Sequence, residues 1–309
     1  MQSPAHALLP PGVVVLERGW LSSNNVVVRG STEAAIVDSG YWTHAEQTIA
    51  LVDGAAGDQP VSVLVNTHLH SDHCGGNSAL QAHFPGLKTF IPPGLAASVR
   101  QWDPVALTYV PTGQHCPPFR IDSVLSAGQT IQLGDLAWEV HAAPGHDPHS
   151  VVLFEPRSRT LISADALWQN GFGVVFPELE GHVAFDEVER TLDVIEHLRP
   201  VVVIPGHGNV FNDVDGALDR ARSRLAAYVA DPRRHATHAA KVLLKFKLLE
   251  LQQVDVADFL TWAESTAYFR IVHQRWFADL PATTWTNELL GELVKSGVAA
   301  REGTRIHNA

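Results

Sequence analysis

Short runs of aliphatic, mostly β-branched residues alternate with polar and glycine positions along the first three quarters of the chain. The runs at 13–16, 25–28 and 34–37 predict successive strands, because β-branched residues bounded by turn-forming residues are typical of sheets. A helical stretch over roughly 43–54 follows, and the apolar run 61–65 predicts a buried strand after it. The pattern therefore indicates a large region of mixed strands and helices.

Three later apolar runs repeat one feature of the run 61–65, which leads directly into His68. The runs 138–141, 160–163 and 201–204 are followed, in order, by Pro144-Gly145-His146, Ala164-Asp165 and Pro205-Gly206-His207. Folds that combine strands and helices expose functional groups at the carboxyl ends of strands. We therefore expect the polar side chains that follow these four strands to share one function.

Beyond about residue 231 the apolar residues recur at helical spacing instead. The stripe predicts helices over 239–253, 258–277 and 286–296, the last of which ends at Gly297. The final stretch, 297–306, can form a small hairpin that turns at Glu302-Gly303. A helix followed by a hairpin is also how a winged-helix module ends.

The balance of acidic and basic residues changes near residue 231, where the hydrophobic pattern also changes. The whole chain has a formal net charge of -11, and residues 1–230 carry 12 basic and 24 acidic side chains, whereas residues 231–309 carry 10 and 9. We predict a catalytic domain over 1–230 and a smaller helical domain over 231–309, joined by a linker at 231–234. The negative field repels polyanions, so nucleic acid is not favoured as a partner.

The cysteine content and the lack of long apolar runs bear on the cellular location of the protein. The two cysteines, Cys74 and Cys116, form no disulfide framework, which favours reduced thiols. Residues 1–11 lack the basic and apolar pattern of a signal peptide, and no apolar run reaches the length of a membrane span. We therefore predict a cytoplasmic protein with no membrane partner. The oligomeric state stays open, with a homodimer as one option.

The densest chemistry lies in the run His68-Leu69-His70-Ser71-Asp72-His73. Three imidazoles and a carboxylate fall within six residues, and Gly75 and Gly76 give the following backbone the freedom that a tight loop needs. These donors suit Zn²⁺ and, less selectively, Mn²⁺, iron or cobalt. A polar loop that merely contains histidines is the alternative, which so many ligand types in so short a run do not favour.

The segment 66–77 resembles the signature of the metallo-β-lactamase superfamily. Later motifs match that family in order, namely Pro144-Gly145-His146, Ser163-Ala164-Asp165 and Pro205-Gly206-His207. The resemblance covers roughly residues 12–230. It implies an α+β fold built as a four-layer αββα sandwich, here followed by a smaller C-terminal helical, winged-helix-like appendage.

The resemblance also implies a ligand set for two metal ions, taken as two Zn²⁺ per chain with iron or manganese as alternatives. The first ion would be held by His68, His70 and His146, the second by Asp72, His73 and His207, with Asp165 bridging both. Asp38 matches an early aspartate of the family that supports the histidine ligands, which is reasonable because a ligating imidazole needs a partner for its second nitrogen. An ordinary Asp-Ser-Gly turn is the alternative for Asp38.

Such a site implies a hydrolase in which a metal-bridging hydroxide attacks an acyl substrate: a thioester, a lactone or an ester. Asp72 would be the catalytic residue that orients the hydroxide and passes on its proton. Asp165 argues against a true β-lactamase, which lacks the bridging aspartate, and His70 stands where oxygen-reducing di-iron members have glutamate. The segment 165–168, Asp-Ala-Leu-Trp, resembles glyoxalase II-type thioesterases.

Two other functions remain open for the same residues. A phosphodiesterase or ribonuclease could use the same metals, and a binding or regulatory protein could keep the fold with little turnover. The near-neutral tail is poorly suited to grip phosphates. Its aromatic residues could instead cover the site or simply pack the helices together; they are Trp262, Tyr268, Phe269, Trp276 and Phe277. The basic residues that could hold glutathione carboxylates are Arg233, Arg234, Lys245 and Lys247.

Overall fold

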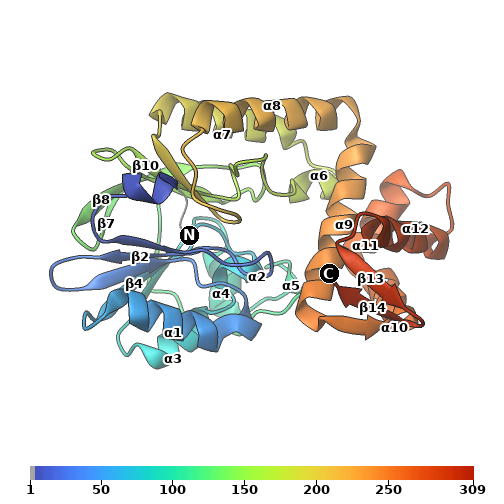
Figure 1. Cartoon of the computed structure of the whole chain (residues 1–309), viewed down its shortest axis with the longest axis horizontal. Coiled ribbons are helices and arrows are strands. Elements are labelled where there is room, and N and C mark those ends of the chain that lie inside the picture. Colours follow the sequence, from blue (N-terminus) through green and yellow to red (C-terminus); the bar gives the residue numbers. More distant parts are fainter. Residues whose placement is uncertain (1–3) are drawn as a thin grey trace.

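Two packed β-sheets form the larger part of the computed structural model, which describes residues 4–309 (Figure 1). In the first sheet the strands run in chain order, antiparallel up to β3 and parallel beyond it. Its strands are β1 (Val13–Leu16), β2 (Asn25–Arg29), β3 (Ala34–Val37), β4 (Val61–Val65), β5 (Lys88–Ile91) and β6 (Ser123–Val124).

The second sheet has the strand order β11-β10-β9-β8-β7. Only β10 and β11 are parallel, and the other neighbours pair antiparallel. Its strands are β7 (Thr130–Leu133), β8 (Leu136–Ala142), β9 (Val151–Glu155), β10 (Thr160–Ala164) and β11 (Val202–Pro205). Fully buried aliphatic residues from both sheets, such as Val28 and Val140, share one core between them.

Helices cover the outer face of each sheet. On the first sheet lie α1 (Ala45–Ala56), which follows the turn η2 (Trp42–His44), and α3 (Asn77–His83), while α7 (Phe185–Leu198) and α8 (Val214–Ala230) cover the second (Figure 1). The expected four-layer αββα sandwich is therefore confirmed. Shorter elements lie in the connections, namely η1 (Pro4–Leu8), α2 (Ser71–Cys74), α4 (Ala96–Gln101), α5 (Tyr109–Thr112) and α6 (Phe176–Glu180).

The last part of the chain consists of helices and one small sheet. The helices are α9 (Pro232–Leu251), α10 (Val256–Ser265), α11 (Ala267–Trp276) and α12 (Ala282–Lys295). The predicted hairpin is present as β13 (Ala299–Glu302) and β14 (Arg305–Asn308), and β12 (Gln253–Asp255) pairs with β14 as a further strand.

The single helix predicted over 258–277 was wrong, because two helices meet there at Thr266. The Thr266 backbone is extended (ψ 132°), and both its amide and its hydroxyl bond to the carbonyl of Trp262. A threonine that satisfies the last carbonyls of a turn with its own side chain ends the helix. The apolar stripe continues across the break, which is why spacing alone did not reveal it.

The predicted linker 231–234 is a tight junction between α8 and α9 rather than a flexible segment. Asp231 accepts a hydrogen bond from the Arg234 amide as the cap of α9, and Pro232 is the first residue of the helix. Both residue types favour these positions, which explains why α9 begins earlier than predicted. The apolar core of α9–α12 also contains Val174 and Leu179, so the division at residue 230 stays a prediction. Across 4–309, none of the helices is both long and apolar enough to span a membrane.

Candidate metal centre

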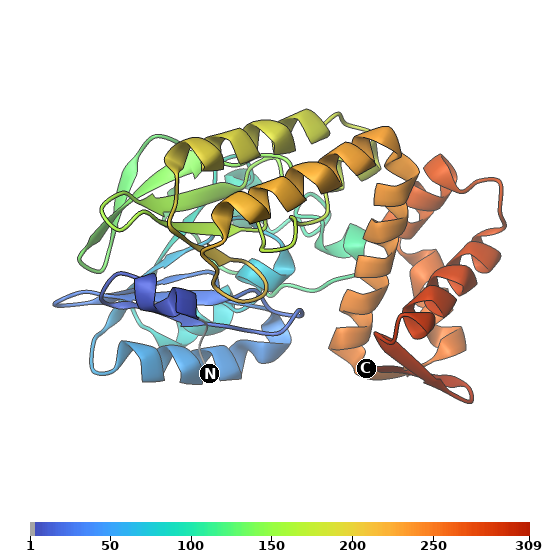
Figure 2. The ribbon, with the colours of Figure 1, turned by 45° about the horizontal axis from the view of Figure 1, so that its top comes forward.

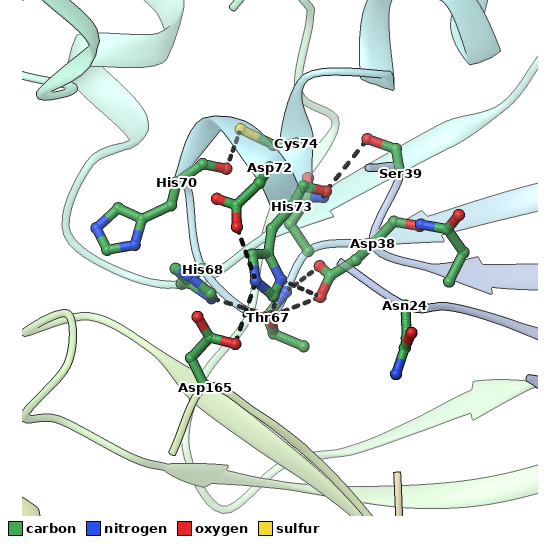
Figure 3. A network of polar contacts seen from close by, with 12 residues as sticks. Asn24, Asp38, Ser39, Thr67, His68, His70, Asp72, His73, Cys74 and Asp165 are labelled. Atoms are coloured by element: carbon green, nitrogen blue, oxygen red, sulfur yellow. Dashed lines mark hydrogen bonds and ion pairs between the residues drawn. The ribbon is translucent and has the colours of Figure 1, made fainter. Parts of the chain in front are cut away.

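All seven predicted ligands meet at one edge of the sandwich. His68 and His70 follow β4, the short helix α2 that comes next carries Asp72 and His73, and Asp165 follows β10 (Figure 3). His146 follows β8, and His207 follows β11. Their donor atoms fall into two groups, within each of which the atoms lie no more than 4.8 Å apart. One group is His68, His70 and His146, and the other is Asp72, His73, Asp165 and His207.

The first group consists of imidazoles alone. The Nδ1 atom of His70 lies 2.8 Å from Nε2 of His146. The Nε2 atom of His68 is buried and has no hydrogen-bond partner within the described residues. Three imidazole nitrogens thus face one another, which is an arrangement that a cation would stabilise.

The second group contains two carboxylates. The Oδ2 atom of Asp72 lies 3.1 Å from Nε2 of His207, and Oδ1 of Asp165 lies 3.4 Å from Nε2 of His73. The other oxygen of Asp165, Oδ2, lies 3.4 Å from Nε2 of His146 in the first group. Asp165 therefore stands between the two groups and offers one oxygen to each.

Asp38 fixes the orientation of both histidines beside it (Figure 3). Its Oδ2 lies 2.7 Å from Nδ1 of His73 and accepts the Thr67 hydroxyl at 2.7 Å, while its Oδ1 accepts the Thr67 amide at 2.9 Å. Because that hydroxyl has given its only hydrogen to a carboxylate, it can only accept from Nδ1 of His68, 3.2 Å away. Both Nε2 atoms are thereby left as lone pairs that face the site. The supporting role predicted for Asp38 agrees with this geometry.

A backbone carbonyl gives His146 the same support. Nδ1 of His146 donates to the carbonyl of Val174 at 2.6 Å, which leaves Nε2 as an acceptor. The next amide, that of Val175, donates to Nε2 of the buried His235 on α9 at 3.1 Å. The segment that orients His146 is thus held from the other side by a helix of the C-terminal part. The sequence offered no signal for His235 or for Thr67 beyond their positions.

The two groups differ in how their surroundings shift the pKa values of their side chains. Burial, with the neighbouring histidines His73 and His70, holds the pKa of His68 well below its ordinary value, and burial with His146 lowers the pKa of His70 to about 4. Burial also opposes protonation of His73, but the carboxylates of Asp165, Asp38 and Asp72 outweigh it and raise the pKa of His73. Burial would raise the pKa of Asp165, and the facing histidines, His73 and His207 first, lower it.

The donor set fits divalent metal ions. Imidazole nitrogens and carboxylate oxygens surround two points, and Nε2 of His68 and of His73 are buried without hydrogen bonds across residues 4–309. Leaving such atoms unsatisfied costs free energy unless a ligand occupies the space they face. The chemistry of the residues thus supports the predicted metal site.

Two tryptophans flank the second group. Trp20, 56% exposed, stacks on His207 with ring centroids 5.3 Å apart. Trp168 contacts both rings edge-on, and its Nε1 donates to Oδ1 of Asp165 at 3.2 Å. Trp20 was not predicted, because a lone tryptophan in a strand connection carries no periodic signal.

The other predicted residues have more ordinary places. Asp147 lies 3.9 Å from His70 through Oδ2 and Nε2, and its Oδ1 accepts a hydrogen bond from the His149 amide. Cys74 is buried against Cys116, with the two Sγ atoms 3.8 Å apart, and burial raises the pKa of its thiol. Both cysteines are free thiols in the structure.

The C-terminal aromatic residues mainly pack the helices. Phe277 stacks on Trp285 and Phe269 contacts it edge-on, in the core of α9–α12. Tyr268 alone reaches toward the site, through Phe176, whose ring lies 4.9 Å from that of His70. The basic residues considered for glutathione do not gather there. Arg233 pairs with Asp279 and Lys247 pairs with Glu250, whereas Lys245 donates to oxygen atoms near the chain end. Within residues 4–309 the Arg234 side chain has neither an ion pair nor a hydrogen bond.

Comparison with known protein families identifies the superfamily of the chain. The profile described as the metallo-beta-lactamase superfamily matches residues 18–207, which is more than half of the chain. The chain belongs to the metallo-β-lactamase superfamily. As a superfamily member with hydrolase relatives it is a metal-dependent hydrolase, and the resemblance, the fold class and the enzyme class expected from the sequence are confirmed.

Curated relatives in the metallo-β-lactamase superfamily include thioester hydrolases. The chain is 28% identical over 232 residues to the acyl-coenzyme A thioesterase MBLAC2 of Gallus gallus, covering 67% of this chain and 81% of that protein. It is 26% identical over 184 residues to hydroxyacylglutathione hydrolase GloC of Haemophilus influenzae, covering 57% and 80%. A solved metallo-beta-lactamase family protein from Thermus thermophilus matches with a TM-score of 0.58 at 19% identity, over 97% of this chain and 99% of that one. That last likeness shows the fold, including the C-terminal part.

Proposed function

We propose that the protein is a dinuclear-metal hydrolase of acyl thioesters. The observation that carries the proposal is the Asp165 carboxylate, whose two oxygens lie 3.4 Å from donor nitrogens of two separate ligand groups. A carboxylate in that position can bridge two ions. His68, His70 and His146 would hold one of them, and Asp72, His73 and His207 the other.

The metals would supply an acidified water nucleophile and polarise the thioester carbonyl. The side chains of the chain supply position and proton transfer. Asp72 is paired through Oδ2 with His207 at 3.1 Å, and despite burial His73 and His207 lower its pKa, so it is ionised at neutral pH. A carboxylate held ionised in this place can accept the proton of the attacking water and later return it to the leaving thiolate.

The substrate class rests on the relatives together with the flanking side chains. Both relatives described above are named as hydrolases of thioesters, of acyl-coenzyme A in one case and of hydroxyacylglutathione in the other. Trp20 and Trp168 offer apolar surface beside His207, against which an acyl chain could lie. Zinc as the native metal and the cytoplasm as the location stay predictions.

A substrate panel on metal-reconstituted protein tests the proposal. It should contain an acyl-coenzyme A, an acylglutathione, a lactone, a β-lactam, a phosphodiester and a short RNA. We expect thioester turnover that chelators abolish and that Asp72→Asn reduces at least about 10²-fold, because the proton acceptor is lost. Turnover of the phosphodiester or RNA alone would replace this proposal with the phosphodiesterase alternative. No turnover at full metal occupancy would favour a binding protein.

A further inference from the structure

A basic groove runs between α8 and α9, and none of the predicted metal ligands lines it. It encloses about 950 Å³ where α9 turns away from the end of α8, as the two orange helices of Figure 2 show. The cationic residues that line it are Arg220 and Arg224 from α8 and Arg234 and Lys241 from α9, against one acidic residue, Asp219. This local excess of positive charge is opposite in sign to the net charge of the whole chain, which is -11.

Two of these cations have no counter-charge. Arg220 is paired with Asp213 at 3.0 Å, and Lys241 with Glu292 at 2.9 Å. Across residues 4–309, by contrast, the guanidinium groups of Arg224 and Arg234 form no ion pair or hydrogen bond (hydrogen bonds of Arg234 come from its main chain). Each guanidinium group presents a planar fork of N–H donors that suits an anion with several oxygens, and these two line one groove from two helices.

The floor of the groove is aromatic and lies close to both cations. Tyr228 is buried, and its ring stacks on that of His238 with centroids 6.1 Å apart. Burial raises the pKa of Tyr228, and the nearby positive charges of Arg224 and Arg234 act against that rise. Burial, with Arg224 and Lys241, lowers the pKa of His238 to about 4, so His238 is neutral and adds no charge at neutral pH.

One turn of the chain connects the groove to the metal centre. The turn spans residues 168–171 and is closed by the hydrogen bond from the Trp168 amide to the Gly171 carbonyl. At its first residue, the Trp168 indole donates to Asp165 in the metal centre. At its far end a Cβ on Gly171 would lie 2.5 Å from the Arg224 guanidinium, and Arg220 donates to the Gln169 carbonyl at 2.8 Å. Three residues span at most about 11 Å, so the groove begins close to the reacting site.

We propose that this groove binds the phosphate groups of the substrate's carrier, a phosphorylated nucleotide thiol such as coenzyme A. The inference rests on the proposed thioesterase function and deepens it. Arg224 and Arg234 would bind the phosphate oxygens, while the flexible arm between the phosphates and the thiol follows the turn 168–171 to the metal centre. A carrier without phosphates, such as glutathione, would leave the groove empty.

The test compares two thioesters that differ only in the phosphorylated nucleotide, namely an acyl-coenzyme A and the matching acyl-pantetheine. We expect wild-type kcat/KM to be higher for acyl-coenzyme A, and this ratio to fall about tenfold or more in the double variant Arg224→Gln/Arg234→Gln, because charge-assisted hydrogen bonds to phosphate are lost. The matched control is Arg222→Gln, on the same helix but paired with Asp193 and Glu196, which should keep the wild-type ratio. A thermal melt of each variant reports its folding.

A second measurement separates this proposal from the proposed function. Calorimetric titration with adenosine 3′,5′-bisphosphate, which has no thioester, should show binding to the wild type that weakens with salt and is lost in the double variant. If neither thioester is hydrolysed but the bisphosphate binds in this way, the thioesterase function fails and the phosphate site stands. If both thioesters are hydrolysed equally and the bisphosphate does not bind, the groove proposal is overturned and the thioesterase function stands. Binding that does not compete with acyl-coenzyme A would also overturn it, since the groove would then serve a separate phosphate compound.

Discussion

The two ligand groups are built from similar side chains but differ in charge. The first group, His68, His70 and His146, has no carboxylate of its own, and neutral oxygens from Thr67 and Val174 orient two of its rings. The second group contains Asp72 and Asp165 and also has Asp38 behind His73. The pKa of His73 in the second group is raised, whereas the pKa values of His68 and His70 in the first group are lowered.

This difference indicates how each group would hold a dication. The neutral group depends on lone pairs that hydrogen bonds keep aimed at one point, so its affinity rests on geometry. The charged group gains from Coulomb attraction as well, in a buried place where that attraction is little screened. Asp165 links the groups, and a change there acts on both.

Replacing the shared carboxylate should have the largest effect. In Asp165→Asn each group loses a charged oxygen while the side chain keeps its size. We expect metal content to fall from about two equivalents to one or fewer, and kcat for the best thioester to fall about 10³-fold, beyond the 10–100-fold typical of outer hydrogen-bond partners. Elemental analysis and initial rates measure both effects. Two retained equivalents would contradict the bridging position.

Removing one histidine from each group tests the difference in charge. His146→Ala and His207→Ala should each leave about one equivalent of metal. We expect the ion left in His146→Ala to be held more tightly, because the group that survives there contains the carboxylates. Competition with a chelator of known affinity ranks the two variants. His141→Ala, whose ring pairs with Glu139 elsewhere, is the control and should match the wild type.

The supporting hydrogen bonds can be removed one group at a time. Asp38→Asn weakens the partner of His73 and, through the Thr67 hydroxyl, that of His68, so both sites should lose about 10–100-fold in metal affinity. Thr67→Val removes only the hydroxyl and should weaken the first site alone. Metal titration with spectroscopically active Co²⁺ distinguishes the sites. A loss at the first site in Asp38→Asn without any loss there in Thr67→Val would show that Thr67 does not relay the effect of Asp38.

The contact of His235 on α9 with the Val175 amide should make the stability of the protein depend on pH. Burial, with His238 nearby, lowers the pKa of His235 to about 3, below its ordinary value of 6.5. As the pH falls below 6.5 the unfolded chain takes up the proton first, so this part of the stability is complete above pH 6.5 and is lost between 6.5 and 3. In metal-free protein, urea unfolding at pH 7.5 and at pH 5.0 measures how much unfolding free energy is lost between the two pH values. This loss should be smaller for His235→Gln than for the wild type, by roughly 1–2 kcal/mol. An unchanged difference would mean that His235 is not held neutral.

The smallest expected effect is at Trp168. Trp168→Phe keeps an aromatic ring beside His207 but removes the indole donor to Asp165. A single partly buried hydrogen bond contributes about 1 kcal/mol, so we expect a loss of about fivefold in kcat/KM with full metal occupancy. Steady-state kinetics beside elemental analysis measures both. A loss of metal would instead show that the donor positions Asp165 for binding.

The sequence predicted the strands that precede the ligands, and the ligands themselves, for the same reason. Each ligand follows an apolar strand, and strands of that kind are recognisable by composition, so His146 and His207 could be assigned although each is a single histidine. The Asp38 position was recognised from its motif. Contacts between distant segments, such as Val175 with His235 at 3.1 Å, depend on how α9 packs, and no local pattern encodes that.

Helix ends were the weakest part of the sequence analysis. The break at Thr266 and the early start of α9 at Pro232 depend on single hydrogen bonds made by Thr266 and Asp231. A periodic stripe of apolar residues passes over such positions without a change. The groove between α8 and α9 was missed as well, because its cations are spread over two helices and only their crossing brings them together.

The buried thiols of Cys74 and Cys116 can report how often the structure around them opens. They are the two cysteines of the chain, and Cys74 follows directly on the ligand His73. A thiol reagent cannot reach the buried Cys74, which lies on α2 with Asp72 and His73, until that part of the chain opens. The rate of labelling therefore counts those openings, and its slowing on addition of Zn²⁺ would report metal binding without any substrate.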